Sequence, residues 1–196
     1  MRVIAGKYRS RALRSLRGMD IRPTSDRLRE TLFDVLTAGS PAALEGSVWM
    51  DLFAGTGAVG IEALSRGAKH VYFVESSAAA ADVLRGNLKS LDIASGFTLL
   101  REELPRAFWH IEREHVAADV VFIDPPYRMK DVYRETLRAL AASPVVWAMS
   151  MVIAEHEKNF EPGEEFGPLR RFRKLVQGSA ALSFYRMGST ADLHGS

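Results

Sequence analysis

A carboxylate stands just before a glycine-rich turn in the first third of the sequence. Asp51 begins the run Asp-Leu-Phe-Ala-Gly-Thr-Gly, residues 51–57, and lies four residues before Gly55. Glycines at such a turn let the backbone approach a ligand closely and let a helix start immediately afterwards. The carboxylate would repel a pyrophosphate but attract the ammonium and sulfonium groups of S-adenosylmethionine. The run therefore favours S-adenosylmethionine as the cofactor.

A second acid, Glu75, follows Asp51 by 24 residues. At about that offset an acidic side chain can accept hydrogen bonds from the hydroxyls of a cofactor ribose. Residues 55–60 also match the dinucleotide fingerprint, so the loop leaves an NAD-dependent oxidoreductase open as an alternative, although no proton donor for hydride chemistry is evident beside it. A further alternative is that both acids only cap the helices that follow them.

The tetrapeptide Asp124-Pro125-Pro126-Tyr127 directly follows an apolar run and is the most specific signal in the chain. Its two prolines restrict the backbone, so this corner is stiff. The Asp124 carboxylate and the Pro125 carbonyl can accept the two hydrogens of an exocyclic amine and stabilise the positive charge that develops as its nitrogen attacks a methyl group. The ring of Tyr127 can stack on the base. An ordinary strand-to-loop turn is the alternative.

Residues 1–29, called the basic arm below, carry most of the positive charge. They hold nine lysine and arginine residues against two aspartates, a net charge of +7, whereas the whole chain has +2 and the remainder therefore −5. Clustered cations with interleaved apolar residues suit contacts with nucleic-acid phosphates. The alternative is an arm that only keeps the protein soluble.

The composition limits other classes of function. With 196 residues and 47% hydrophobic content, the chain suits one domain with extensions. It has no cysteine, and its five histidines show no paired helical spacing, so we expect neither disulfides nor a metal site. No apolar run reaches the ~20 residues of a membrane-spanning helix and no secretory signal is evident, so we expect a cytoplasmic protein that does not enter membranes.

Short apolar runs alternate with helical patterns, which predicts a parallel sheet covered by helices. Strands are predicted at residues 48–53, 70–75 and 120–123, so Asp51, Glu75 and Asp124 lie at or next to strand ends. Ligands of open α/β sheets lie beyond the carboxyl ends of the strands, so we expect Asp51, Glu75 and Asp124 to converge there. Further strands are predicted at residues 97–100 and 151–154, with a C-terminal hairpin at 172–176 and 180–185. Helices are predicted at residues 26–36, 57–66, 76–91, 104–114 and 132–142.

Taken in order, residues 51–57, Glu75 and residues 124–127 resemble the class I methyltransferases that act on amino groups of bases. The first part of the chain narrows the resemblance. Residues 2–11 and 22–33, extended by 62–68, are similar to the bacterial 16S ribosomal RNA (guanine-N2)-methyltransferase family. The similar segments span residues 2 to about 186.

The resemblance implies a Rossmann-like α/β fold. We expect a mostly parallel seven-stranded sheet with helices on both faces and an antiparallel C-terminal hairpin. The methyltransferase domain would cover residues 31–188, after a basic RNA-contacting extension at 1–30 and before a flexible tail at 189–196. The implied substrate is ribosomal RNA or a small-subunit assembly particle, and the implied enzyme is a monomer.

The resemblance also assigns site residues. Residues 124–127 would hold the target amine. The cofactor would be bound by Asp51, Phe53, Gly55, Gly57 and Glu75. The RNA contacts are expected instead from the positive charge of the basic arm, at Lys7, Arg9, Arg11, Arg14, Arg22 and Arg27. One position departs from the family, which has Asp or Asn followed by Ala after the third strand where this chain has Arg101-Glu102-Glu103; Glu102 is the candidate to replace it near the cofactor adenine.

Two alternatives share these motifs. An adenine-N6 methyltransferase on DNA would use the same tetrapeptide, and only the family-like N-terminal segment argues against it. A non-catalytic RNA-binding module would have no need for the intact residues 124–127.

Overall fold

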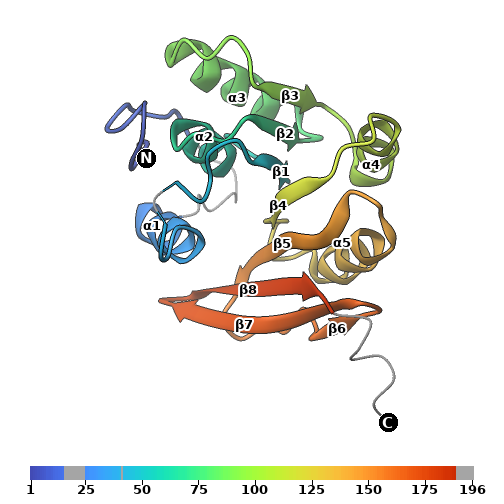
Figure 1. Ribbon diagram of the computed structural model, residues 1–196. Coiled ribbons are helices and arrows are strands. Elements are labelled where there is room, and N and C mark those ends of the chain that lie inside the picture. The colour runs from blue at the N-terminus through green and yellow to red at the C-terminus, as the bar shows by residue number, and fades with distance from the viewer. Residues whose placement is uncertain (16–24, 41, 189–196) are drawn as a thin grey trace. The chain divides into compact units, whose positions relative to one another are not determined.

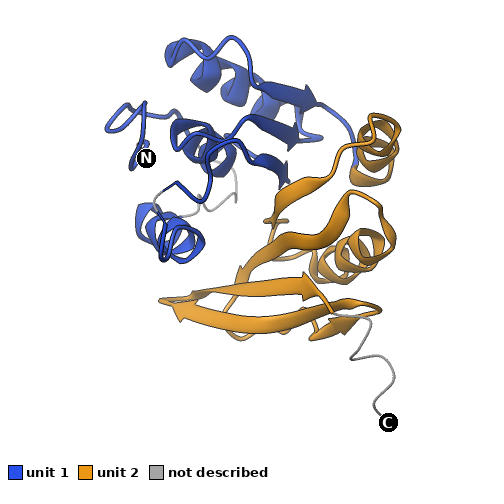
Figure 2. Cartoon of the chain, viewed as in Figure 1, with its two compact units in different colours: residues 1–103 blue, residues 104–196 orange. Residues whose placement is uncertain are grey.

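The computed structural model describes residues 1–15, 25–40 and 42–188. The chain forms two compact units, residues 1–103 and residues 104–196 (Figure 2). Arg22, predicted to contact RNA, and the predicted tail at 189–196 lie outside the described residues. The expected boundaries at residues 30 and 188 stay predictions.

The first unit is built on three parallel strands in the order β3-β2-β1 (Figure 1). Their bounds are Val48–Leu52 for β1, His70–Val74 for β2 and Phe97–Leu100 for β3. All three lie where the sequence predicts them, in runs of apolar and β-branched residues that suit a half-buried pleated surface. Leu52 pairs with Val74, so the carboxyl ends of β1 and β2 lie side by side.

Three helices belong to this unit, α1 (Asp26–Leu36), α2 (Ala58–Ser65) and α3 (Ala78–Ser90). Ser25 and Ser77 cap α1 and α3, because each side-chain oxygen accepts a hydrogen bond from a backbone N–H of the first turn. The predicted helices are confirmed. Helix α2 follows Gly57 directly, and this N-cap residue has no side chain that could cap it.

Close packing fixes the helices against these strands. Phe33 of α1 stacks on Trp49 of β1 with 5.4 Å between the ring centroids. Gly60 of α2 lies so near β2 that an added Cβ would come within 2.2 Å of the Phe73 ring. The first turn of α2, and with it the end of the glycine loop, is therefore held against the sheet.

The second unit contains two helices, α4 (Leu104–Arg113) and α5 (Lys130–Ala142), close to their predicted positions. Its strands are β4 (Ala118–Ile123), β5 (Val146–Glu157), β6 (Glu165–Phe166), β7 (Leu169–Gln177) and β8 (Ala180–Met187). They lie in the order β4-β5-β8-β7-β6. Strands β4 and β5 are parallel, and the pairs that follow are antiparallel. The predicted C-terminal hairpin is confirmed as β7 and β8.

Two strand predictions were wrong. Strand β5 begins at Val146 instead of residue 151. The register with β4 shifts there, and residues 147–149 are all exposed, so the alternation that reveals a strand is lost. Strand β6 was missed because two residues are too few to show a period of two. The described residues therefore hold eight strands, where the resemblance implied seven.

Within the described ranges, no helix combines the length and apolarity needed to cross a membrane. Among the same residues, no group of three or more histidine and acidic side chains could hold a metal ion.

Candidate active site

Asp51 lies near the end of β1 and is buried. Its Oδ2 accepts a hydrogen bond from the backbone N–H of Gly60 at 2.9 Å, which ties the strand to the first turn of α2. Burial raises the pKa of Asp51 to about 7; the Gly60 hydrogen bond acts to lower it and the charge of Glu75 to raise it further. A cation bound nearby would favour the ionised carboxylate, so this environment suits a positively charged ligand.

The loop between β1 and α2 has an unusual backbone. Phe53, Gly55 and Gly57 all have positive φ, at 62°, 55° and 78°. Glycine adopts this conformation freely, but for Phe53 it carries strain of the kind that gathers at functional sites. An added Cβ at Gly57 would lie 2.8 Å from Leu84 of α3, whereas one at Gly55 would meet only the Phe53 carbonyl oxygen, at 4.0 Å. The loop therefore packs tightly at Gly57 and leaves space within this unit beside Gly55.

Glu75 directly follows β2, next to the end of β1, and is half-buried. Its Oε2 accepts a hydrogen bond from the N–H of Gly55 at 2.8 Å, and its Oε1 accepts one from the N–H of Ser77 at 2.7 Å. Glu75 thus supports the glycine loop and the start of α3, as the helix-capping alternative requires. A carboxylate can accept about four hydrogen bonds, so these two contacts leave capacity for ribose hydroxyls.

Glu102 is half-buried and comes two residues after β3. The N–H of Glu75 donates to the carbonyl of Leu100 at 3.0 Å, so β3 ends beside β2. The first unit therefore brings together the backbone positions of Asp51, Glu75 and Glu102 along one edge of its three strands.

The second unit holds residues 124–127, which follow β4 directly, as predicted. Asp124 and Tyr127 are half-buried, and Pro125 is buried. The carbonyl of Pro126 accepts a hydrogen bond from the N–H of Met129 at 2.8 Å, which closes a tight turn before α5. The predicted convergence of Asp124 with the acids of the first unit stays a prediction.

Tyr133 is a residue that sequence reasoning missed. It is fully buried on α5, and its hydroxyl lies 3.1 Å from the Pro125 carbonyl oxygen and 2.9 Å from that of Glu155. Burial, followed by the charge of Asp124, raises the pKa of Tyr133 well above its usual range, so the hydroxyl keeps its proton and acts as a donor. Its position on the apolar stripe of α5 predicts only a core residue, because nothing local indicates that the hydroxyl reaches Pro125.

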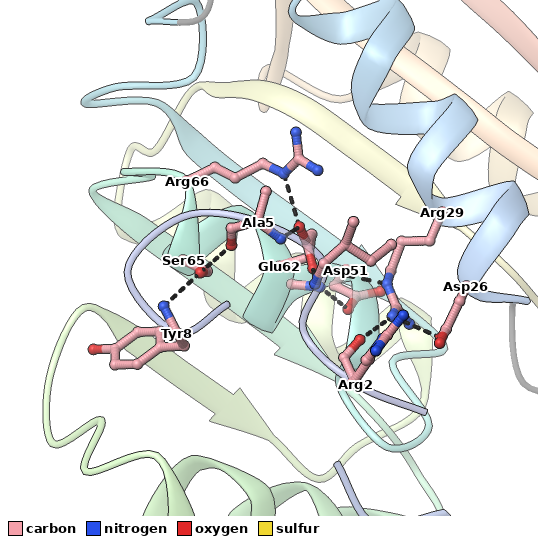
Figure 3. Close-up of polar contacts among 11 residues, drawn as sticks. Arg2, Ala5, Tyr8, Asp26, Arg29, Asp51, Glu62, Ser65 and Arg66 are labelled. Carbon is pink, nitrogen blue, oxygen red and sulfur yellow. Dashed lines mark hydrogen bonds and ion pairs between the residues drawn. The ribbon is translucent and has the colours of Figure 1, made fainter. Parts of the chain in front are cut away.

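The start of the basic arm is bound to α2 (Figure 3). The buried carboxylate of Glu62 accepts hydrogen bonds from the N–H groups of Ile4 and Ala5, at 2.7 and 2.9 Å. Ser65 donates through Oγ to the Ala5 carbonyl at 2.5 Å and accepts from the N–H of Tyr8 at 2.9 Å. Residues 1–15 are therefore a docked segment whose backbone is fixed on the first unit.

The same contacts surround a buried arginine. Arg29 of α1 donates to the Arg2 carbonyl and to Asp26, and its Nε lies 3.9 Å from Glu62. Burial lowers the pKa of Arg29, while the charges of Glu62 and Asp26 act in the opposite direction. Glu62 also pairs with Arg66 at 2.8 Å, so one carboxylate joins α1, α2 and the start of the arm (Figure 3).

Apart from the buried Arg29, the cations that the structure describes in the arm are exposed to solvent. The exposed side chains that were predicted to contact RNA are Lys7, Arg9, Arg11, Arg14 and Arg27. A hollow of about 540 Å³ is lined by parts of residues 2–10 and by the start of α1. Its lining includes Arg2, Arg9 and Arg27 together with Asp26 and Glu30. Three arginines around one hollow suit a nucleic-acid phosphate.

Comparison with solved structures defines the class of protein. The chain aligns with the structure of yhhF from Escherichia coli, named as a candidate methyltransferase, at a TM-score of 0.79 and 28% identity, covering 97% of this chain and 99% of that one. The expected fold class, the Rossmann-like fold of class I methyltransferases, is confirmed in this way.

The chain belongs to the family described as Conserved hypothetical protein 95, whose model matches residues 1–186. Its curated relatives include two proteins named ribosomal RNA small subunit methyltransferase D. That of Escherichia coli K12 is 31% identical over 188 residues, covering 95% of this chain and 89% of the relative. That of Haemophilus influenzae is 33% identical over 159 residues, covering 81% and 80%. The family resemblance noted in the sequence is confirmed.

Proposed function

We propose that this protein transfers a methyl group from S-adenosylmethionine to the exocyclic N2 of a guanine in small-subunit ribosomal RNA. The observation that carries the proposal is the intact Asp-Pro-Pro-Tyr corner after β4 in a chain that the family model matches over residues 1–186. The relatives named above supply the substrate class, and the corner supplies the groups that an amine nucleophile needs.

The first unit would hold the cofactor. Asp51 offers a buried carboxylate whose ionised form a cation stabilises, Glu75 has acceptor capacity for the ribose hydroxyls, and the open space beside Gly55 allows close approach of the backbone. Phe53 and Gly57 shape the same loop, and we assign Glu102 to the adenine amine. Bound S-adenosylmethionine would supply an electrophilic methyl group.

The second unit would hold the target amine. The lone pair of an exocyclic amine is delocalised into the base, so its nitrogen must move towards tetrahedral geometry before it attacks. Asp124 and the Pro125 carbonyl would accept its two hydrogens and stabilise the charge that develops on nitrogen. Pro126 keeps the corner stiff, and Tyr127 would stack on the base.

The basic arm would bind the RNA. Its exposed cations stand on a docked backbone, so they are presented in a defined arrangement and lose little freedom on binding phosphates. The RNA contacts we assign are Lys7, Arg9, Arg11, Arg14, Arg22 and Arg27, with Arg22 outside the described residues. With ribosomal RNA or a small-subunit assembly particle as its partner, the enzyme would act in the cytoplasm as a monomer.

The proposal is tested with labelled S-adenosylmethionine and nucleic acid from cells that lack the enzyme, followed by digestion to nucleosides. We expect the label in N2-methylguanosine from small-subunit RNA. Label in N6-methyladenine from DNA would support the alternative methyltransferase instead, and calorimetric binding of NAD without binding of S-adenosylmethionine would support an oxidoreductase.

The catalytic assignment is tested with Asp124 variants in single turnover. Asp124→Ala should slow methyl transfer by ~10²-fold or more, because a preorganised acceptor of the developing charge is lost. Asp124→Asn should be milder, since its amide oxygen still accepts a hydrogen bond. Affinity for S-adenosylhomocysteine, measured separately, should stay at the parent value in both. Transfer at the parent rate by Asp124→Ala would mean that the corner is only a turn.

A further inference from the structure

Asn87 of α3 connects the basic arm to the cofactor loop. It is fully buried, and its Nδ2 donates to the Thr56 carbonyl at 2.9 Å and to the Arg14 carbonyl at 3.1 Å. Its Oδ1 accepts from the N–H of Arg14 at 2.8 Å. Both amide hydrogens are therefore used, one on the loop and one on the arm.

Contacts one turn before and one turn after Asn87 along α3 reinforce this connection. Leu84, one turn before Asn87, is the side chain that lies against Gly57 of the loop. One turn further on, the carbonyl of Ser90 accepts a hydrogen bond from the Arg11 side chain at 2.5 Å. The helix thus contacts the loop and the arm along the same few residues, and Asn87 is hydrogen-bonded to both.

We propose that Asn87 is a positioning residue that couples RNA binding on the arm to cofactor binding at the loop. The inference rests on the proposed function, because it assumes that the arm binds RNA and the loop binds S-adenosylmethionine. Phosphates held by Arg11 and Arg14 would stabilise the docked position of the backbone that Asn87 bonds twice. Through the Asn87 amide this would also stabilise the Thr56 carbonyl in its present position, so the loop conformation seen here would be favoured for the cofactor.

Coupling of this kind predicts the direction in which each affinity changes, and it predicts the same change for both ligands. Because RNA and cofactor would favour the same ordered arrangement, each should tighten the binding of the other by the same factor. Allosteric couplings commonly amount to about 5-fold to 150-fold in affinity. For two sites joined through one side chain we expect a value near the lower end, about fivefold.

The experiment measures the affinity of the full-length protein for S-adenosylhomocysteine, which allows no turnover, with and without a saturating transcript of bacterial small-subunit ribosomal RNA. The parent should bind about fivefold more tightly with RNA present. In Asn87→Asp the side chain keeps its shape and its acceptor for the Arg14 N–H but loses both donors, so the ratio should fall close to one. Asn87→Ala should give the same result.

Ser65→Ala is the matched control. It also removes two partly buried hydrogen bonds to the arm, those with Ala5 and Tyr8, and neither of these bonds involves the loop. If Asn87 had only a structural role, Ser65→Ala and the Asn87 variants would lose stability and keep the RNA-dependent ratio alike. Coupling through Asn87 requires that Ser65→Ala keep the ratio while the Asn87 variants lose it.

If a folded Asn87 variant still binds S-adenosylhomocysteine about fivefold more tightly with RNA present, as the parent should, the inference is overturned. Should both Asn87 variants fail to fold, hydrogen exchange in the parent decides: RNA should slow exchange of the amides of residues 53–60, and unchanged exchange would overturn the coupling. If the parent binds both S-adenosylhomocysteine and RNA, but with the same affinity for S-adenosylhomocysteine whether or not RNA is present, only the inference is contradicted. A parent that binds neither contradicts the proposed function.

Discussion

At the residue scale, the buried Asp51 carboxylate makes the stability of the cofactor-free protein depend on pH. Its pKa of about 7 in the folded protein exceeds the ~3.9 of an unfolded chain. Between these values the folded protein keeps a proton that the unfolded chain has released. The contribution of Asp51 to stability is therefore complete below pH ~4 and is lost as the pH rises through 7.

We predict that Asp51→Asn removes this part of the pH dependence. One pKa unit corresponds to about 1.4 kcal/mol, so the variant should gain stability relative to the parent by on the order of a few kcal/mol between pH 4 and 8. The measurement is urea unfolding of the cofactor-free proteins across that range. Asp82→Asn, at an exposed acid on α3, is the control and should parallel the parent. If the stability of Asp51→Asn changes with pH as steeply as that of the parent, Asp51 is not the group that causes the pH dependence.

A second residue-scale prediction concerns Tyr133, whose hydroxyl reaches the Pro125 carbonyl. Tyr133→Phe should cost about 1 kcal/mol of stability for the lost hydrogen bond. Because Pro125 would then be held less firmly, the variant should lower kcat while KM for RNA changes little. Steady-state methyl transfer provides both constants.

Tyr185→Phe is the control for that measurement. Its hydroxyl donates to the Gly163 carbonyl at 2.8 Å in the same unit, and this bond does not involve residues 124–127. It should lose comparable stability and keep the parental kcat. If the two variants have the same kcat, Tyr133 does not help to position residues 124–127.

At the scale of elements, Glu62 determines how the arm, α1 and α2 are held together. Its carboxylate accepts hydrogen bonds from Ile4 and Ala5 and forms ion pairs with Arg66 and with the buried Arg29. Removing one member of a buried ion pair leaves an uncompensated charge, which usually costs more than the pair itself contributes. The arrangement is therefore sensitive to the loss of Glu62.

We predict that Glu62→Ala lowers the free energy of unfolding by about 3–5 kcal/mol. Glu62→Gln should cost less, because its amide oxygen still accepts from the arm backbone. Glu30→Ala, at an exposed acid of α1, should stay within ~0.5 kcal/mol of the parent. Urea denaturation with equal m-values measures all three, and a loss in Glu62→Ala no larger than that in Glu30→Ala would show that this carboxylate does not hold the elements together.

At the scale of the whole molecule, charge is divided between a basic arm of +7 and a remainder of −5. Replacing Arg9, Arg11 and Arg14 together with alanine should weaken RNA binding and reduce the slope of log K against log salt by up to about 2, at roughly 0.7 per phosphate contact on single strands. Cofactor affinity without RNA should not change, because the backbone contacts of residue 14 remain. Salt titrations of RNA binding test this, and an unaltered slope would leave the arm as a solubilising segment.

Much of the fold and of the candidate site could be predicted from local sequence. Strand β3 and helix α1 lie at the predicted residues, and the acids at the ends of β1, β2 and β4 could be read from apolar runs that stop at a charge. Residues 53–57 could be found because glycine frees the backbone at its own position. Residues 124–127 could be found because proline restricts the backbone at its own position. These features depend on neighbours within a few residues, and so the sequence by itself determined them.

Only the tertiary structure decided which of these residues act through distant partners. Glu62 meets the arm across 57 and 58 positions, and Asn87 meets it across 73. Neither side chain differs locally from any polar residue on a helix, and the raised pKa of Asp51 likewise depends on how deeply β1 is covered. Burial and long-range hydrogen bonds arise from the packing of elements, which periodicity and spacing along the chain do not encode. The docked arm, the Tyr133 contact and the bridge at Asn87 therefore became visible only in three dimensions.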